Sequence, residues 1–146
     1  MIQRLVIDSS LAVSWCVIDE NLNSANSVLD EINAGSVAIC PSLWVWEVNN
    51  ALLLAERRGR LTTEERHRQL FLFQNLPIEI DHAAQQHVWN DVGSIAERFR
   101  LTVYDAAYLE MAIRHQLPLG TLDQELRKAA DLSGMECVPH KISKKN

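Results

Sequence analysis

The sequence predicts an α/β fold, a three-layer α/β/α sandwich with a central, mainly parallel sheet. Short apolar segments alternate with helical ones along the whole chain, which is typical of repeated strand–helix–strand units. The expected strands are continuous apolar runs, as strands buried on both faces of a parallel sheet are. The 146-residue chain has the length of one domain, and no repeat or linker divides it.

The boundaries of the expected elements follow from turn residues and apolar spacing. Glycines end three of the helices, and acidic residues occupy the first turn of the helix that begins near Thr62. The expected strands are residues 5–7, 36–40, 77–80, 117–121 and 135–138. The expected helices are residues 9–17, 22–35, 43–59, 62–76, 81–99, 102–116 and 123–134, with Asp81 as the cap of the fifth.

Composition narrows the classes of function. The chain has no apolar run of about 18 residues and no signal-peptide pattern at its start, so we expect a cytoplasmic protein without a transmembrane helix. Cys16, Cys40 and Cys137 are far apart and fit buried thiols better than disulfides. A net charge of −5 argues against a protein that coats nucleic acid through bulk positive charge. It leaves room for an enzyme that meets a phosphodiester through bound cations.

Two acidic residues lie at the carboxyl ends of expected strands. Asp8 follows the first strand, and Asp123 follows the strand at 117–121. Ligands of open α/β sheets bind beyond these strand ends, and parallel strands would bring both carboxylates to the same edge. Each carboxylate also has a structural interpretation, because each is well placed to cap the helix that follows it.

Two more acids, Asp105 and Glu47, fall within the apolar stripes of expected helices. Asp105 can also complete a capping box with Thr102, whereas Glu47 lies in mid-helix and has no such role. A buried acid costs several kcal/mol unless it is paired or neutralised. No Lys or Arg occurs in residues 43–56 or 101–113, so a partner must come from elsewhere. The two stripes are Leu43, Glu47, Asn50, Ala51 and Leu54, and Asp105, Tyr108, Leu109 and Ala112.

Four carboxylates gathered at one sheet edge would need to be neutralised. Two carboxylates about 6 Å apart repel by about 3 kcal/mol at an effective dielectric of about 20. Four such groups would destabilise the fold by an amount comparable with its whole stability. Oxygen-only, carboxylate-rich sites suit Mg²⁺ or Mn²⁺, and such ions activate water for attack on a phosphodiester. The residues alone therefore indicate a metal site suited to phosphodiester hydrolysis.

Four segments, in order, resemble the motifs of PIN domains of the VapC toxin type. They are "VIDSSLAVSW", "PSLWVWEVNNALL", "LTVYDAAYLEMA" and "PLGTLDQELRKAA". Each segment carries one of the four acids, and the last keeps the Thr-x-Asp pattern. One motif alone is weakly specific, but four in the right order along nearly the whole chain are strongly specific.

The resemblance implies a PIN domain over residues 1–140, followed by a frayed basic tail at 141–146. It implies an endoribonuclease that depends on Mg²⁺ or Mn²⁺ and acts as the toxin of a toxin–antitoxin pair. RNA is then the substrate, a cognate antitoxin is the protein partner, and the chain forms a homodimer. The main alternative is a PIN-like binding module without catalysis. A phospho-acceptor domain is disfavoured because no second acid adjoins Asp8 and no late strand ends in Lys.

The resemblance also implies roles for individual residues. Asp8 and Asp105 are the expected direct metal ligands, and Glu47 and Asp123 bind the metal directly or through water. Ser10 and Thr121 occupy the family's small hydroxyl positions, where hydrogen bonds would orient the carboxylates or the water. The expected catalytic group is Asp8, Glu47, Asp105 and Asp123.

Other polar and aromatic residues have simpler interpretations. The five histidines show no zinc-ligand spacing, since His82 and His87 would face different sides of a helix. The tryptophans at 44, 46 and 89 fit core or dimer packing better than base stacking. The basic residues near the end of one helix and in the tail fit solvent-exposed roles better than RNA contacts; they are Arg57, Arg58, Arg60, Lys141, Lys144 and Lys145.

Overall fold

A five-stranded parallel sheet forms the centre of the protein, whose computed structural model describes residues 2–143. The spatial order of the strands is β3-β2-β1-β4-β5, and every neighbouring pair is parallel. The α/β prediction is confirmed. Residues 144–146 of the predicted basic tail lie outside the described residues. The strands are β1 (Arg4–Ile7), β2 (Val37–Cys40), β3 (Ile78–Ile80), β4 (Leu119–Gly120) and β5 (Cys137–Val138).

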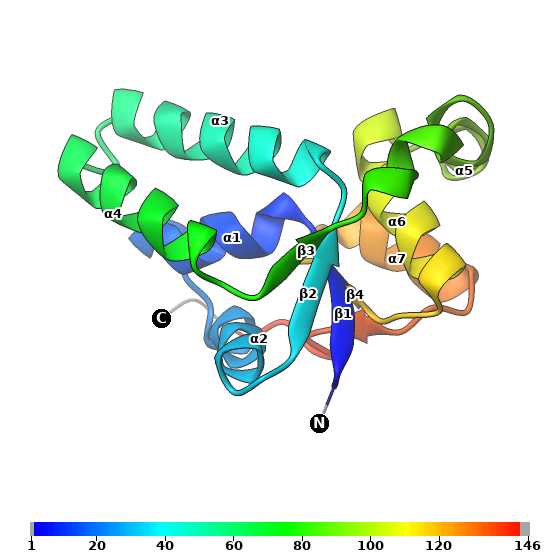
Figure 1. Ribbon diagram of the computed structural model, residues 1–146, viewed down its shortest axis with the longest axis horizontal. Helices are drawn as coiled ribbons and strands as arrows, with labels where there is room; N and C mark the ends of the chain where they lie inside the picture. Colours follow the sequence, from blue (N-terminus) through cyan, green and yellow to red (C-terminus); the bar gives the residue numbers. More distant parts are fainter. Residues whose placement is uncertain (1, 144–146) are drawn as a thin grey trace.

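Helices cover both faces of this sheet, which makes three layers (Figure 1). One face carries α1 (Ser9–Cys16), α2 (Asn23–Asn33), α3 (Leu43–Arg57) and α4 (Thr63–Gln74). The other carries α5 (Gly93–Phe99), α6 (Val103–His115) and α7 (Gln124–Leu132). This division follows from right-handed crossovers, because the chain adds β2 and β3 on one side of β1 and then β4 and β5 on the other.

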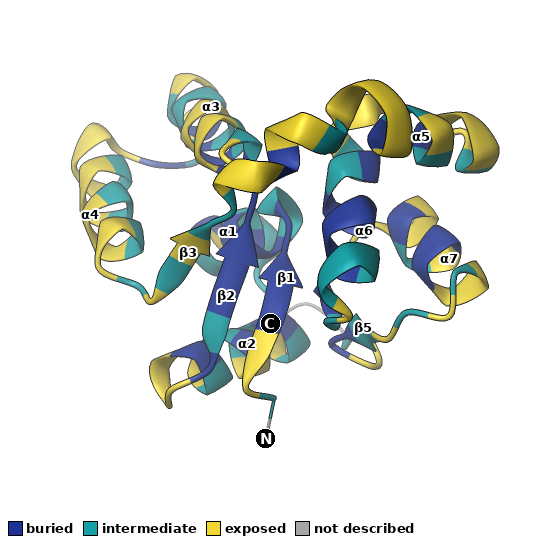
Figure 2. Ribbon diagram, turned by 45° about the vertical axis from the view of Figure 1, so that its right-hand side comes forward, coloured by how far each residue is buried: buried dark blue, intermediate teal, exposed yellow. Residues whose placement is uncertain are grey.

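The core lies between the sheet and the two helical layers (Figure 2). Leu5, Val6 and Ile7 of β1 are fully buried, as expected for the central strand of a covered parallel sheet. In α2, the residues that reach the core are Ala25, Val28 and Ile32, which share one face of the helix. Burial of this kind contributes roughly 25 cal/mol per Å² of apolar surface, and it is the main source of the fold's stability.

The buried face of α3 differs from the predicted stripe. Glu47 lies at the flank of the helix, half-buried, and Asn50 is exposed. The prediction was wrong because α3 has apolar residues on nearly every side, so that spacing alone does not select one face. The residues that reach the core are Trp44, Val48, Leu52 and Ala55.

The segment expected as one helix at 81–99 is broken into three pieces. A 3₁₀ helix at His82–His87 is followed by a π-helical turn at Val88–Val92 and then by α5. Asp81 caps the first piece as predicted, since its Oδ1 accepts from the Ala83 amide at 3.0 Å. Apolar spacing indicates helical turns here, but it does not distinguish 3₁₀, α-helical and π-helical turns from one another. A separate short 3₁₀ helix occupies Ile18–Glu20.

The sheet reverses its direction of growth between β1 and β4. These strands are neighbours, with Ile7 opposite Gly120, and the Asp8 amide donates to the Gly120 carbonyl at 3.0 Å. Gly120 is needed here, because a Cβ at this position would lie 2.8 Å from Leu11 Cδ1 and 3.2 Å from the Val6 carbonyl oxygen. The chain therefore places Asp8 and Thr121 side by side at the point where open α/β sheets bind ligands.

Among the described residues, no helix has the length and apolarity that crossing a membrane requires.

Candidate functional site

Asp8 is the most buried acid at this edge of the sheet. It ends β1 and caps α1, and only 4% of its surface is exposed. Its Oδ1 accepts from the backbone amide and the hydroxyl of Ser10, at 3.0 and 2.6 Å, and its Oδ2 accepts from the Thr121 hydroxyl. The indole of Trp44 donates to the Asp8 carbonyl at 3.0 Å. These contacts fix both the backbone and the carboxylate.

The two hydroxyl groups are themselves held in a defined orientation. The Leu122 amide donates to Ser10 Oγ at 2.9 Å, and the Asp123 amide donates to Thr121 Oγ1 at 3.0 Å. Because each hydroxyl oxygen already accepts from an amide, its proton is directed toward Asp8. Ser10 and Thr121 therefore lie where the sequence predicted that they would act.

Asp123 and Asp105 both take part in helix capping. Asp123 caps α7, with Oδ1 accepting from the Leu126 amide at 2.8 Å. Asp105 lies in the first turn of α6, and its amide donates to the capping Thr102 at 3.0 Å. Both side chains are more exposed than that of Asp8. The capping interpretation is confirmed for Asp123, whereas Asp105 completes no capping box, because Thr102 is the cap and its hydroxyl accepts from the Asp105 amide. Both backbones are fixed while carboxylate oxygens stay available.

Glu47 approaches the same edge from α3, on the opposite face of the sheet from α6. The hydroxyl of Tyr108 donates to Glu47 Oε1 at 2.5 Å, and Ser9 of α1 acts to lower the pKa of this carboxylate. Tyr108 belongs to α6, one turn after Asp105. Tyr108 was predicted to lie in an apolar stripe, and its polar contact was not predicted. The signal in the sequence was the spacing of three residues between Asp105 and Tyr108, which puts both on one side of the helix.

Burial raises the pKa of three of these four carboxyl groups. It raises the pKa of Asp8 to about 6, although the hydrogen bonds from Ser10 and Thr121 act in the opposite direction. Burial also raises the pKa of Glu47, and the negative charge of Asp105 raises it further. The pKa of Asp105 is raised by burial and then by the charge of Asp123. The acids from α3, α6 and the turn before α7 therefore share one electrostatic environment.

No basic side chain neutralises this group. Across residues 2–143, no Lys, Arg or His nitrogen lies within 4.0 Å of the four carboxylates. Arg127, on the helix that Asp123 caps, instead donates to the carbonyls of Thr121 and Pro139 at 2.8 and 2.6 Å. An all-oxygen donor set with raised pKa values and no counter-charge fits a hard divalent cation such as Mg²⁺ or Mn²⁺.

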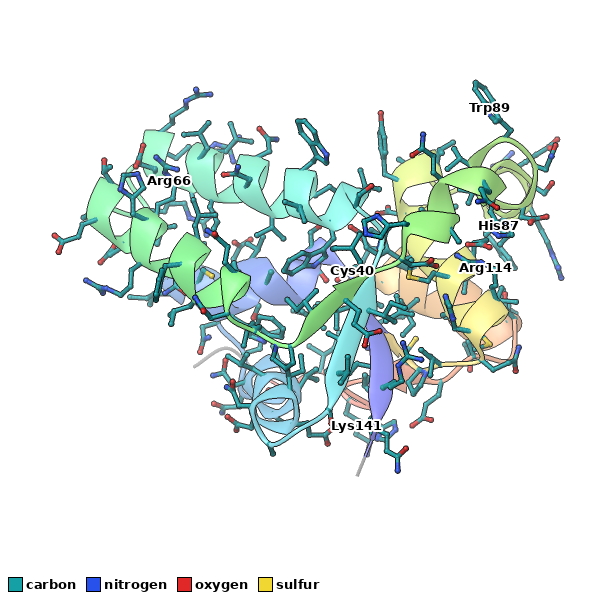
Figure 3. The ribbon with its side chains drawn as sticks, in the orientation of Figure 1. Cys40, Arg66, His87, Trp89, Arg114 and Lys141 are labelled. Atoms are coloured by element: carbon teal, nitrogen blue, oxygen red, sulfur yellow. The ribbon has the colours of Figure 1, made fainter. Side chains whose placement is uncertain are left out.

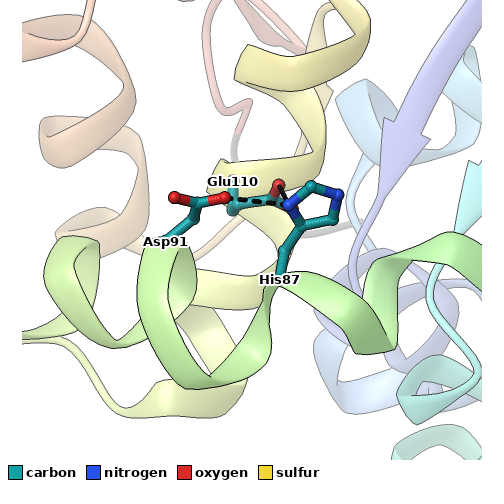
Figure 4. A group of neighbouring side chains, drawn as sticks. All are labelled: His87, Asp91 and Glu110. Carbon is teal, nitrogen blue, oxygen red and sulfur yellow. Dashed lines mark hydrogen bonds and ion pairs between the residues drawn. The ribbon is translucent and has the colours of Figure 1, made fainter.

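A second group of acids lies on the outer side of α6, around Arg114 (Figure 3). His87 Nδ1 lies 2.8 Å from Asp91 Oδ2 and 3.6 Å from Glu110 Oε1 (Figure 4). These three ligand atoms lie within 4.8 Å of one another, which is close enough to hold a cation. This cluster was not predicted from the sequence, because its residues come from separate segments near the π-helical turn and from α6.

Arg114 pairs with two of the acids in this region. Its guanidinium takes both oxygens of Glu110, at 2.7 and 3.2 Å, and its Nη1 lies 2.8 Å from Asp81 Oδ2. His115 Nε2 lies 2.9 Å from the same Asp81 oxygen. The group is therefore a compensated network that holds the segment at 81–92 against α6.

Apart from Trp44, which contacts the Asp8 carbonyl, the remaining candidates lie away from the acidic edge or are exposed. Trp44 is buried as expected, whereas Trp46 and Trp89 are 76% and 91% exposed. Arg57 and Arg58 are exposed at the far end of α3. Lys141 lies near the start of β1, at the opposite end of the sheet from Asp8 (Figure 3). Among the described residues, no three of the four predicted acids have ligand atoms within 4.8 Å of one another. Their charges nevertheless link Glu47 to Asp105 and Asp105 to Asp123, and the basic residues named here lie away from them.

The comparisons with known proteins agree with this fold. A model of the PIN domain family matches residues 5–132. No curated protein matches the sequence at a significant level. A crystal structure of a protein from Pyrobaculum aerophilum is similar, with 22% identity, a TM-score of 0.64, and coverage of 88% of this chain and 84% of that one.

Two further solved structures are complexes. VapBC2 from Rickettsia felis, bound to a promoter DNA fragment, is 14% identical with a TM-score of 0.62 and coverage of 92% of this chain and 96% of that one. A toxin–antitoxin complex from Klebsiella pneumoniae is 15% identical with a TM-score of 0.59 and coverage of 84% and 89%. At such identities the likeness shows the fold. Since the family model also spans most of the sequence, this chain belongs to the PIN domain family.

Proposed function

We propose that this protein is a metal-dependent endoribonuclease and that it acts as the toxin of a toxin–antitoxin pair in the cytoplasm. The observation that carries the proposal is a set of acids with no basic partner among the described residues: Asp8, Glu47, Asp105 and Asp123. Asp8 and Asp123 follow the neighbouring parallel strands β1 and β4. Membership of the PIN family supports nuclease activity. The toxin–antitoxin complexes among the similar folds support the biological role.

The proposed chemistry is the hydrolysis of a phosphodiester by water. When bound, Mg²⁺ or Mn²⁺ supplies the positive charge that lowers the pKa of water and stabilises the phosphorane-like transition state. Asp8 and Asp105 are the proposed direct ligands, and Glu47 and Asp123 bind directly or through water. Ser10 and Thr121 hold the carboxylate of Asp8 in one orientation. An acidic protein then tolerates a polyanionic substrate, because the bound cation reverses the local charge.

The proposed partners are RNA, a cognate antitoxin and a second copy of the chain. Two of the solved structures with this fold contain a toxin with its antitoxin. Co-expression with the protein encoded beside it, followed by purification of the pair, tests the antitoxin. Light scattering of the purified chain tests the homodimer.

Cleavage of a mixed cellular RNA pool tests the nuclease. The purified protein is incubated with Mg²⁺, with Mn²⁺ and with EDTA, beside Asp8→Asn. We expect discrete fragments that require the metal and that the variant does not produce. Glu110→Gln is the matched control, because it removes a buried acid of the compensated network and keeps the acidic edge intact.

Two results would contradict this proposal. Cleavage that persists in EDTA and in Asp8→Asn would place the activity elsewhere or in a contaminant. No cleavage of any RNA, with intact binding of Mn²⁺, would favour the binding module without catalysis.

A further inference from the structure

We propose that Tyr108 is a positioning residue that holds Glu47 in the geometry needed for cation binding, and that this contact joins the two helical layers across the site. The inference rests on the proposed function, because it concerns the same acidic edge. It assigns a role to a residue outside the four acids and the two hydroxyls of the motifs.

The contact between Tyr108 and Glu47 has a fixed direction. A carboxylate can only accept, so the Tyr108 hydroxyl donates its single proton to Glu47 Oε1 at 2.5 Å. Tyr108 is 1% exposed, and water does not compete for that proton. A buried hydroxyl without a partner is destabilising. The core fixes the position of the Tyr108 ring. The position of the Glu47 side chain therefore depends on this hydrogen bond.

The two residues come from opposite faces of the sheet. Glu47 lies on α3, which covers one face, and Tyr108 lies on α6, which covers the other (Figure 1). Tyr108 also follows Asp105 by three residues on the same helix, so the same rigid turn carries a proposed ligand and the group that orients its neighbour. The hydrogen bond therefore sets how far Glu47 lies from Asp105.

Glu47 depends on this support more than the other acids do. Asp8, Asp105 and Asp123 all have backbones fixed by capping at helix N-termini. Glu47 is in the interior of α3 on a longer side chain, half-buried, where capping cannot hold it. Its carboxylate is held from α6 by the Tyr108 hydroxyl, and Ser9 of α1 acts on its pKa. Without Tyr108, the side chain is free to turn toward solvent.

Calorimetric titration of the metal-free protein with Mn²⁺ tests this role. Tyr108→Phe removes the donor and keeps the ring, and we expect it to weaken Mn²⁺ binding by roughly 10-fold, as outer partners of metal ligands do. Tyr104→Phe is the matched control on the same helix, because Tyr104 is 60% exposed, and its affinity should equal that of the wild type. Circular dichroism checks that each variant is folded.

A double variant separates positioning from a structural effect. In the Glu47→Gln background, Tyr108→Phe should change Mn²⁺ affinity less than about 2-fold, because its effect passes through the carboxylate. Ser9→Ala, which releases the same carboxylate from α1 without disturbing the buried ring, should weaken binding in the same direction. This variant keeps the proposal testable if Tyr108→Phe does not fold.

The possible results distinguish this proposal from the proposed function. Unchanged Mn²⁺ affinity in Tyr108→Phe, or the same loss with and without the Glu47 carboxylate, would overturn the positioning role. No change in Ser9→Ala would also count against it. A wild type that binds no Mn²⁺ would overturn both proposals. A wild type that binds Mn²⁺ in a Tyr108-dependent way but cleaves no RNA would overturn the nuclease alone.

Discussion

The protein has two groups of acids around α6, and they differ in how their charge is compensated. On the outer side, Arg114 pairs with Glu110 and Asp81, and His115 also reaches Asp81. At the carboxyl edge of the sheet, Asp8 receives hydrogen bonds from hydroxyls and amides only. One helix thus borders a group whose buried acids are paired with Arg114 and a group whose acids have no basic partner among the described residues.

The pKa values show what this difference means. Burial alone would raise the pKa of Asp81, but hydrogen bonds from His115 and Arg114 outweigh burial and lower it. Burial raises the pKa of Asp8 to about 6, and its hydrogen bonds do not restore the usual value. The first group stabilises the fold as it stands. The second keeps buried carboxylates without a counter-charge, which is the environment that the proposed cation site requires.

The largest effect that we expect is the loss of RNA cleavage in Asp8→Asn. Replacing an outer partner of a metal ligand costs about 10- to 100-fold, so that replacing a proposed ligand should cost at least about 1,000-fold. Asparagine still caps α1, and the fold should remain. Initial rates of cleavage at saturating Mg²⁺ measure the effect. A loss of comparable size in Glu110→Gln would show that the two groups do not differ in function.

Arg114→Met should turn the compensated group into an uncompensated one. Removing one partner of a largely buried ion pair leaves charge without compensation, and we expect the free energy of unfolding to fall by about 3 to 4 kcal/mol at pH 7. Added Mn²⁺ should restore part of it through His87, Asp91 and Glu110. Chemical denaturation in the Asp8→Asn background isolates this group. A variant as stable as its parent would show that Arg114 compensates nothing.

The metal-free protein should become less stable as the pH rises from about 4 to about 6. Asp8 has a raised pKa in the folded state, so the folded protein holds its proton more tightly than the unfolded chain does. The free energy of unfolding therefore falls through this range, by about 2 to 3 kcal/mol, and levels off above it. The difference between wild type and Asp8→Asn, followed by denaturation in EDTA, gives the Asp8 contribution. A difference that is independent of pH would contradict the buried, uncompensated state of Asp8.

Asp123→Asn should have the smallest effect on stability. Asn caps a helix as well as Asp does, and Asp123 is exposed, so the free energy of unfolding should change by less than about 0.5 kcal/mol. RNA cleavage should nevertheless fall by roughly 10-fold, as it does for an outer partner, because we expect Asp123 to reach the metal through water. Melting temperature and cleavage rate on the same preparation test both parts. RNA cleavage at the wild-type rate in Asp123→Asn would show that Asp123 acts only as a helix cap.

The acids that end strands could be located from the sequence. Asp8 and Asp123 follow apolar runs, and parallel pairing of those runs brings them to one edge. The capping and metal-binding interpretations were set against each other, but the structure shows that they are compatible. A cap uses one oxygen of a carboxylate and fixes its backbone, and the remaining lone pairs stay available.

The features that the sequence did not reveal depend on contacts between elements. The predicted core-facing side of α3 was wrong because that helix has apolar residues on nearly every side. Only packing against α1 and α4 selects Trp44 and Val48. The bond between Tyr108 and Glu47 and the network of His87 with Glu110 each join distant segments. Local periodicity carries no information about such pairs.

Anomalous diffraction from crystals grown with Mn²⁺ is the most direct test of the proposed cation site at the acidic edge. We expect an anomalous peak for a Mn²⁺ ion whose distances to oxygens of Asp8 and Asp105 are about 2.0 to 2.4 Å. We expect no peak between His87, Asp91 and Glu110. A peak at the second group alone, or none at either group in crystals that bind Mn²⁺ elsewhere, would contradict it.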